Sequence, residues 1–566
     1  MKKLLILFIT LRYLRFIQIR YQLWYRLRSF WRKVIRYKYS FFIEREAIPV
    51  TLLSWIEKPV SFAYEIFTFL NISKSYKSGK IIWNEHEFSR LWAYNLNYMD
   101  YLLQPGMDEK TGIQLIENFI QNLSENRTGL EPYPISLRGI NWIKFFSITE
   151  NLTQRLWKEP TALVAKKKID SSLYTQYKIL LDNIEYHLLA NHLLEDGFSL
   201  LYGAFYFNEV LFYNKAKKII EGELEEQILE DGAHFELSPM YHQIILDRLL
   251  DCINLLQNNQ RFEGQEILME LMQRKAQKML TWLNAITFSN GEIPLLNDSA
   301  SGIAPTTQQL NKYAERLNLQ NVNFRRVEGR NQQPEICNNM ERSGNPAITF
   351  EKLSLSGYRK FTSPIYECII DVGQIGPSYQ PGHAHADTLN FVLNVNNEPV
   401  IVDSGISTYN VCDFRLTERG TAAHNTVTVL DQNSSQVWSS FRVARRAKVE
   451  LLKDEKDWVM ARHNGYKKLG TVHQREWKFS KTQIEIRDTL NGKIKKGKAH
   501  IWFSPIVKPL QNNHIIETGN VTLIIENADS IKLIQTRIPN GFNKFSKTYK
   551  VEIQFTAQLK TIISSL

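Results

Sequence analysis

Cysteine is scarce in this sequence. The 566 residues include only four cysteines, which lie far apart, and no two of them form a CxxC pair. This spacing argues against a disulfide framework and against a zinc site built from cysteine, and it leaves the redox compartment open. The four residues are Cys252, Cys337, Cys368 and Cys412.

The N-terminal region lacks a long hydrophobic run. Leu4 to Thr10 follow Met1-Lys-Lys as in a signal peptide, but Arg12 and Arg15 interrupt the pattern and no small-residue cleavage site follows. The apolar run is also far too short to span a bilayer. We therefore expect no clear cleavable signal peptide and no transmembrane helix in this region.

Acidic residues are absent before Glu44. Residues 1–43 carry eleven lysines and arginines, so removing them from the net charge of +12 leaves only +1 for the remaining chain. A basic footprint for nucleic acid should lie on the folded domain that reads the nucleic acid. The nearly neutral remainder therefore argues against a nucleic-acid partner.

Aromatic residues interleave with these cations between Leu11 and Tyr39. Such a mixture is typical of a helix that lies on an anionic membrane surface or docks on an acidic partner. A helical arm packed on its own domain explains the pattern equally well. Both interpretations stay open from the sequence, so peripheral membrane contact through residues 1–43 is one of two expectations.

The length suggests several domains, and the hydrophobic periodicity divides them. From about residue 81, apolar residues recur three and four apart, which predicts helices; from about residue 347 they alternate, which predicts antiparallel strands. The polar segment between these regions predicts a linker. We expect an arm with lead-in helices (1–80), a helical domain (81–325), a linker (326–346) and a β-domain (347–566).

The most specific local pattern is Pro381-Gly-His-Ala-His-Ala-Asp387, just before a predicted strand. In an extended segment His383 and His385 project from the same face. With Asp403 and His424, His385 would supply two imidazoles and one carboxylate, a ligand set typical of zinc. The alternative is that each histidine is an ordinary residue with a satisfied hydrogen bond.

The helical half offers a second set of candidates. Ser238 followed by Pro239 predicts a helix start, which places Tyr241 in the first turn. There the helix dipole should lower the pKa of the phenol, as a tyrosine general base requires. The alternative is an interfacial aromatic whose hydroxyl caps a polar group. Asn191 and His192 are equally consistent with hydrogen bonding at a helix end.

In their shared order these motifs resemble the heparinase II/III-like polysaccharide lyases, a family that includes related alginate lyases. The resemblance runs from about Trp92 to His473. Its motifs are Tyr133 to Trp142, Asn191-His192, Asp231 to His242, Pro294 to Asp298, Gly382 to Asp387, Asp403 to Tyr409 and Arg419 to Val427. The family implies an incomplete (α/α) toroid followed by an antiparallel β-sandwich domain.

The resemblance implies a lyase that cleaves a 4-O-linked uronic acid in an acidic polysaccharide by β-elimination. Asn191 and His383 would hold the substrate carboxylate, Tyr241 would act as acid and, in a syn elimination, also as base, and His192 or Tyr409 would otherwise take the C5 proton. The implied zinc ligands are His385, Asp403 and His424. Substrate contacts would come from Arg138, Asn141, Trp142, Glu236, His242, Arg415 and Arg419.

Two other functions stay open at this point. A uronyl C5-epimerase would share proton abstraction but return the proton to the opposite face, and a non-catalytic polysaccharide-binding or assembly protein would keep only the groove. The family implies a place in the bacterial cell envelope. The basic arm would instead suit a membrane-associated protein that trims acidic polysaccharide where it is assembled.

Overall fold

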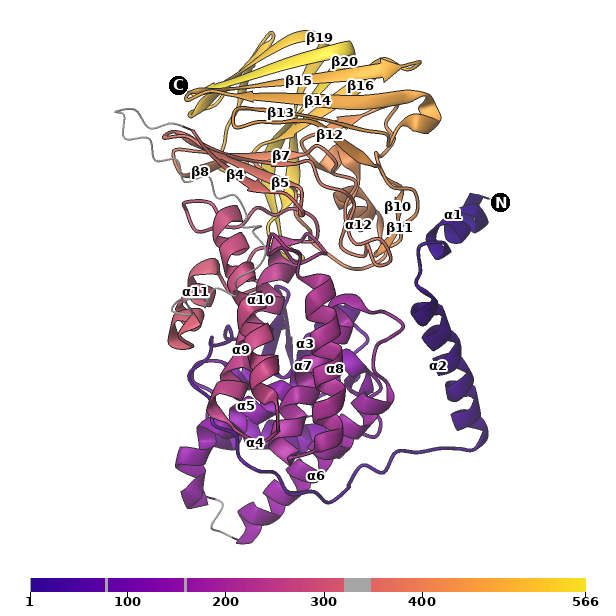
Figure 1. Cartoon of the computed structure of the whole chain (residues 1–566), viewed down its shortest axis with the longest axis vertical. Helices are drawn as coiled ribbons and strands as arrows, with labels where there is room; N and C mark the ends of the chain where they lie inside the picture. Colours follow the sequence, from indigo (N-terminus) through magenta and orange to yellow (C-terminus); the bar gives the residue numbers. More distant parts are fainter. Residues whose placement is uncertain (1, 77–79, 157–159, 320–347, 566) are drawn as a thin grey trace.

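The computed structural model describes residues 2–76, 80–156, 160–319 and 348–565. Helices fill one half of the molecule and strands the other, and two N-terminal helices stand beside them (Figure 1). The predicted linker 326–346 lies outside the described residues. Within the described part of the chain, no helix is long and apolar enough to cross a membrane.

The N-terminal region begins with α1 (Lys2–Leu11) and α2 (Phe16–Val34). A small antiparallel sheet follows, where lead-in helices were predicted. Its strands are β1 (Phe62–Ala63), β2 (Ile66–Phe69) and β3 (Ile72–Ser75). The prediction was wrong because residues alternate in β2: Phe67 and Phe69 are buried against the helical core, whereas Ile66 and Thr68 are exposed.

The helical domain is built from amphipathic helices around a shared core. In α4, for example, Ile116, Phe119 and Ile120 face inward, as their spacing predicts. α7 is buried on nearly all sides and therefore lies at the centre. The helices are α3 (Arg90–Tyr98), α4 (Glu109–Asn122), α5 (Pro132–Leu156), α6 (Pro160–Asp182), α7 (Ala190–Phe207), α8 (Val210–Gln227), α9 (Pro239–Asn258), α10 (Gln265–Ile286) and α11 (Thr307–Arg316).

The β-domain is a sandwich of two antiparallel sheets. The smaller sheet runs in the order β4 (Thr349–Leu353), β5 (Tyr358–Thr362), β6 (Tyr366–Asp371), β7 (Phe391–Val395) and β8 (Glu398–Ile401). Its inner face packs on the larger sheet, where Phe361 stacks on Phe479 with ring centroids 3.6 Å apart. The helical domain followed by this sandwich confirms the predicted fold class.

The larger sheet carries the alternation that the sequence predicts, most clearly in β14, where buried residues occupy every second position. Its order is β12 (Val449–Asp454), β13 (Trp458–His463), β14 (Thr471–Phe479), β15 (Gln483–Gly492), β20 (Phe545–Ser565), β19 (Val521–Pro539), β18 (Ile515–Glu517) and β17 (Leu510–Asn512). β16 (Lys496–Trp502) pairs with β20 and with β9 (Val427–Thr428). β10 (Val437–Trp438), β11 (Arg442–Val443) and α12 (Asp413–Glu418) belong to loops beside the sandwich.

Buried hydrogen bonds join the two domains. Asn297, in the loop after α10, donates to the Leu237 carbonyl (2.9 Å) and accepts from the His385 backbone amide (3.0 Å). Asp231, in the loop before α9, accepts from the Ser356 amide (2.7 Å). These loops hold the motif residues of both domains at one junction.

Candidate active site

Asp298 is the centre of the polar network at this junction. The carboxylate is fully buried and accepts two hydrogen bonds from Arg415, at 2.5 and 2.6 Å. It also lies 2.9 Å from Nδ1 of His383 and 2.8 Å from Nε2 of His385. Burial alone would raise the pKa of Asp298, but Arg415 and the two imidazoles hold it well below its usual range. One helical-domain carboxylate therefore orients three β-domain side chains.

The two histidines precede a strand, as predicted, but the segment that carries them is not extended. Residues 381–390 form turns, and β7 begins only at Phe391. His383 and His385 nevertheless point to the same carboxylate, because Asp298 bonds to one nitrogen of each ring. The two side chains therefore point the same way, as predicted, but the cause is their shared bond to Asp298 and not an extended backbone.

Tyr241 lies directly on His383. Ser238 caps α9 by accepting from the Tyr241 amide, and Pro239 takes the first helical position, which confirms the predicted helix start. The rings of Tyr241 and His383 stack with centroids 3.8 Å apart. The Tyr241 hydroxyl is 3.1 Å from the Tyr409 hydroxyl. The two tyrosines, one from each domain, thus meet beside the imidazole.

The predicted lowering of the Tyr241 pKa is wrong. Burial disfavours the phenolate and raises the pKa of Tyr241 far above its usual value, although the hydrogen bond with Tyr409 opposes the shift. Burial raises the pKa of Tyr409 in the same way. Desolvation outweighs the helix dipole here, so both phenols hold their protons in the free protein.

Asn191 completes this group of side chains from the start of α7. Its side-chain amide donates to both oxygens of Glu236 (3.0 and 2.9 Å) and lies 3.5 Å from Nε2 of His383. Glu236, predicted to bind substrate, is buried at the same place. The residues before Asn191 are strained: Leu189 and Ala190 have φ of 62° and 56°, which non-glycine residues rarely adopt. Such strain concentrates at functional sites.

His192 has a dedicated carboxylate partner. Its Nδ1 lies 2.9 Å from Glu185, and its ring packs on Tyr133 with centroids 4.5 Å apart. Burial is the largest influence and opposes the imidazolium, but the charge and hydrogen bond of Glu185, with the charges of Glu236 and Glu195, together raise the pKa of His192. With Nδ1 engaged, Nε2 of this partly exposed ring is left for a reacting proton.

The predicted zinc ligands lie close together. His424 Nδ1 is 2.8 Å from Asp403, and the rings of His424 and His385 are 5.2 Å apart. Nε2 of His424 and Nδ1 of His385 are buried, with no hydrogen-bond partner in the described structure. As these side chains stand, no group of three or more His, Cys, Asp or Glu residues in the described ranges is arranged to hold a metal. The two unpartnered nitrogens nevertheless fit such an ion.

Three predicted substrate contacts are instead core residues. Arg138 is fully buried, and its guanidinium donates to Gln176 and to backbone carbonyls, among them those of Asn97 and Gly129. Asn141 donates to the Tyr98 carbonyl, and Trp142 is completely buried with its indole N–H on Met99. These predictions were wrong because the hydrogen-bonding groups are used to hold the helices together.

Three further predicted contacts also have internal roles. His242 is buried between the His234 amide and the Met279 carbonyl, and burial lowers its pKa to about 3. Arg415 is committed to Asp298. Arg419 is buried and donates to the carbonyls of Ala384 and Ser440. The two arginines therefore stabilise residues 381–390, the histidine loop. The prediction of direct substrate contact is wrong for all three residues.

Asp298 and Glu185 are functional residues that the sequence does not reveal. Asp298 stands at the end of a quoted motif, but nothing in its spacing shows that Arg415, His383 and His385 converge on it from the other domain. Glu185 lies seven residues before His192 across a turn, and only the fold brings them together.

Comparisons with known proteins place the chain in one family. Residues 171–321 match the model described as "Heparinase II/III N-terminus", and residues 346–549 match "Heparinase II/III-like, C-terminal". A curated heparin-sulfate lyase from Bacteroides thetaiotaomicron is 24% identical over 291 residues. That match covers 46% of this chain and only 38% of the relative.

Solved structures share the fold at low sequence identity. The crystal structure of heparinase III gives a TM-score of 0.66 at 18% identity, over 87% of this chain and 80% of that one. Heparan sulfate lyase HepC from Pedobacter heparinus gives 0.56 at 16% identity, over 88% and 81%. A chondroitinase AC lyase gives 0.51 at 9% identity, over 83% and 75%. From its two domain matches and its shared architecture, the chain belongs to the heparinase II/III-like family.

Proposed function

We propose that this protein is a polysaccharide lyase that cleaves a 4-O-linked uronic acid in an acidic polysaccharide by β-elimination. The observation that carries the proposal is the stack of Tyr241 on His383, beside Asn191 and Tyr409, at the junction of the two domains. The similarity to a heparin-sulfate lyase and to a heparan sulfate lyase supports the same reaction class.

Neutralising the substrate carboxylate is the first requirement, because its charge makes the C5 proton poorly acidic. Nδ2 of Asn191 and Nε2 of His383 lie 3.5 Å apart, and Nδ2 would turn from Glu236 to the substrate carboxylate. With Nδ1 of His383 on Asp298, a protonated ring would direct its second N–H at the carboxylate, and the anionic Asp298 would balance the charge. Together these groups would stabilise the enolate-like intermediate.

Two further groups would move the protons. His192, held by Glu185, would remove the proton from C5. The bond from C4 to its oxygen then breaks as the double bond between C4 and C5 forms, and the departing oxygen takes the proton of Tyr241. Burial keeps that phenol protonated, which suits an acid better than a base. When both protons lie on one face of the sugar, Tyr241 would have to serve both steps.

Replacing Tyr241 by Phe tests the assignment of the acid. We expect kcat to fall by on the order of 10² to 10⁴, because positioned acid–base catalysis contributes that factor. The assay follows the ultraviolet absorbance of the unsaturated uronate end across a panel of acidic polysaccharides. Tyr64→Phe is the control, since that side chain is 95% exposed. Near-normal turnover by Tyr241→Phe would contradict the assignment.

The pH dependence tests the base. His192 acts only when neutral, and Glu185 raises its pKa, so kcat/KM should fall as the pH drops through a value above the ordinary histidine pKa of about 6.5. In Glu185→Gln the pKa of His192 falls, and the acidic limb should move to lower pH. Glu209→Gln, which removes a carboxylate paired with Arg45, should leave the limb in place. An unmoved limb in Glu185→Gln would exclude His192 as the base.

We also propose that zinc is bound by His385, Asp403 and His424. Support comes from the unpartnered nitrogens of the two buried rings. Asp403 bonds to Nδ1 of His424 in the free protein and would turn from that nitrogen to join them. When bound, the ion would supply a fixed positive charge beside the histidine loop. His385 contacts the same Asp298 that orients His383, so the zinc residues would help position the imidazole.

Metal analysis of the purified protein tests this site. We expect stoichiometric zinc, and we expect His385→Gln to lose the zinc and to melt at a lower temperature. His500→Gln is the matched control. His500 is also buried in the β-domain, but its Nε2 lies within hydrogen-bonding distance of the Thr428 hydroxyl and it is not one of the proposed zinc ligands. The proposal would be refuted if protein purified without chelators contained no zinc and had the same melting temperature as protein supplemented with zinc.

A further inference from the structure

The N-terminal arm, residues 2–34, attaches to the protein by one side of α2. That side is polar, and its contacts recur every three or four residues along the helix. Gln18 donates to the Leu188 carbonyl (3.2 Å), Tyr25 to the Ile184 carbonyl (2.5 Å) and Arg28 to Asp182 (3.0 Å), while Arg32 also pairs with Asp182 and Arg15 with Glu226. The expectation of an arm packed on its own domain is therefore correct for this side.

The opposite side of α2 is exposed and mainly apolar, with Arg20 as a cation among its apolar residues. Seven large side chains on it are at least half exposed: Phe16 (79%), Leu23 (62%), Trp24 (51%), Leu27 (52%), Phe30 (61%), Trp31 (56%) and Val34 (57%). A helix on the surface of a soluble domain normally turns its apolar face to the core and its polar face to water. In α2 the arrangement is reversed, and this apolar side lacks a partner among the described residues.

The exposed apolar surface continues into α1. Leu4, Leu5, Leu7, Phe8 and Leu11 are between 43% and 70% exposed. The less exposed side of α1 carries Ile6, Ile9 and Thr10, and the Thr10 hydroxyl accepts from the Trp438 indole at 3.1 Å. Arg446 lies 3.9 Å from the ring of Tyr13, just after α1. Both helices of the arm thus expose large apolar side chains to solvent.

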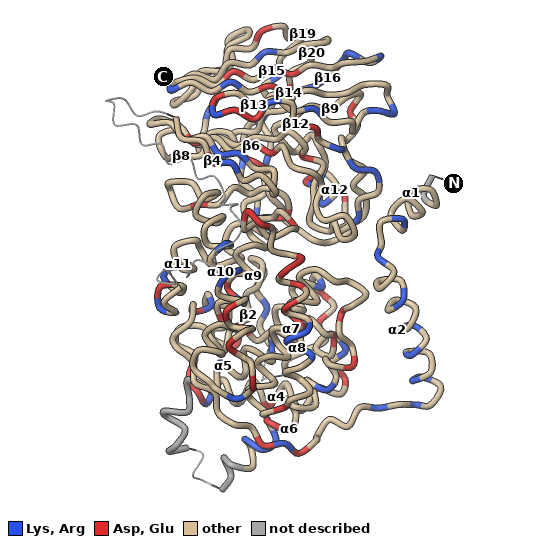
Figure 2. Tube along the Cα trace, viewed as in Figure 1, with Lys and Arg blue, Asp and Glu red and all other residues tan. Residues whose placement is uncertain are grey.

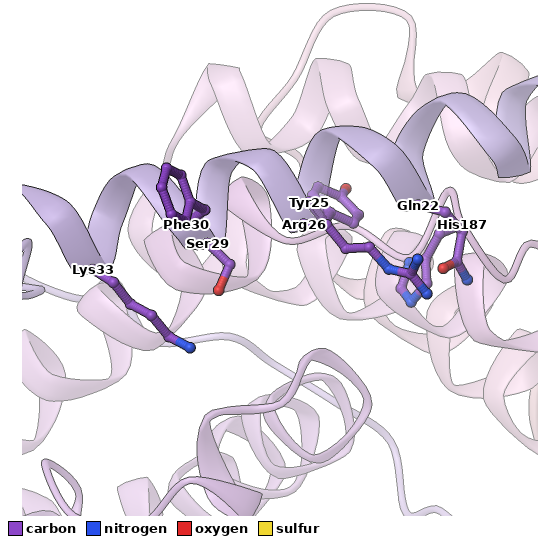
Figure 3. A pocket seen from close by; sticks show the side chains of 7 residues that line it. All are labelled: Gln22, Tyr25, Arg26, Ser29, Phe30, Lys33 and His187. Carbon is purple, nitrogen blue, oxygen red and sulfur yellow. The ribbon is translucent and has the colours of Figure 1, made fainter.

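The positive charge of the arm favours a negatively charged partner. Figure 2 shows Lys and Arg but no acidic residue along α1 and α2, in agreement with the sequence up to Glu44. An open groove of about 420 Å³ lies between α2 and the body, and its lining includes Arg26, Ser29 and Lys33 of the helix and His187 of the body. In Figure 3, Arg26, Ser29 and Lys33 extend from the same side of α2. The cationic side chains of Arg26 and Lys33 suit a phosphate group.

We propose that the outer face of the arm lies flat on an anionic phospholipid surface. The apolar side chains enter the boundary between headgroups and acyl chains, and Arg26 and Lys33 bind lipid phosphates at the groove. A second copy of this arm is a poorer partner, because two surfaces rich in cations and free of acidic residues repel each other. The inference is independent of the proposed polysaccharide reaction.

Binding of the full-length protein to lipid vesicles tests the apolar contribution. We expect the protein to co-float with vesicles of phosphatidylcholine and phosphatidylglycerol but hardly with phosphatidylcholine alone. Changing Leu23, Leu27 and Phe30 to Ser should lower the partition coefficient at least about tenfold, because buried apolar area drives interfacial binding. The control changes two exposed side chains of the β-domain, Leu355 and Leu510, to Ser and should bind normally.

The two cationic side chains have their own test. Arg26→Glu with Lys33→Glu should lower partition about tenfold or more, whereas Lys481→Glu with Lys493→Glu makes the same charge change on the β-domain and should have little effect. Equal binding to neutral and anionic vesicles, or none to either, would overturn the proposal. So would a dimer in solution that is lost in the Ser variant, since it would assign the face to a second copy.

Two control measurements distinguish a loss of vesicle binding from misfolding of the variants and from failure of the proposed lyase function. None of the substituted arm side chains is buried, so each variant should melt at the wild-type temperature. Tyr241→Phe should bind vesicles like the wild type whether or not the protein proves to be a lyase. Loss of vesicle binding in Tyr241→Phe would show that the arm does not act alone and would contradict the proposal.

Discussion

The buried ion pair between Asp298 and Arg415 is the interaction on which the site depends. Removing one member of such a pair leaves an uncompensated charge, typically at a cost of about 3–5 kcal/mol. Here the same carboxylate also fixes His383 and His385, so it joins the helical domain to the histidine loop. The relative position of Tyr241 and His383, which come from different domains, follows from this connection.

The site is also linked to the arm through one loop. Side chains of α2 donate hydrogen bonds to the backbone carbonyls of Ile184 and Leu188. Glu185, the partner of His192, lies between these two residues in the chain. The same loop ends in the strained residues Leu189 and Ala190, just before Asn191. The surface that we assign to the membrane therefore rests on the segment that presents two of the proposed active-site residues.

The sequence predicts local features well and burial poorly. Periodicity predicts both domains, and Ser238-Pro239 predicts the start of α9, because neighbouring residues determine these features. Arg138 and Arg419 look like anion-binding residues until the fold shows their donors on buried carbonyls. The Tyr241 pKa was predicted in the wrong direction for the same reason: desolvation depends on residues that are distant in sequence.

The activity of Asp298→Asn tests the central claim most directly. This change keeps the size of the side chain but removes the charge that holds Arg415 and both histidines. We compare variant protein that remains folded and still binds oligosaccharide. We predict that its kcat/KM for the polysaccharide, measured by formation of the unsaturated product, falls about a hundredfold or more, because His383 loses its orientation. A folded Asp298→Asn variant with near-wild-type kcat/KM would contradict the account.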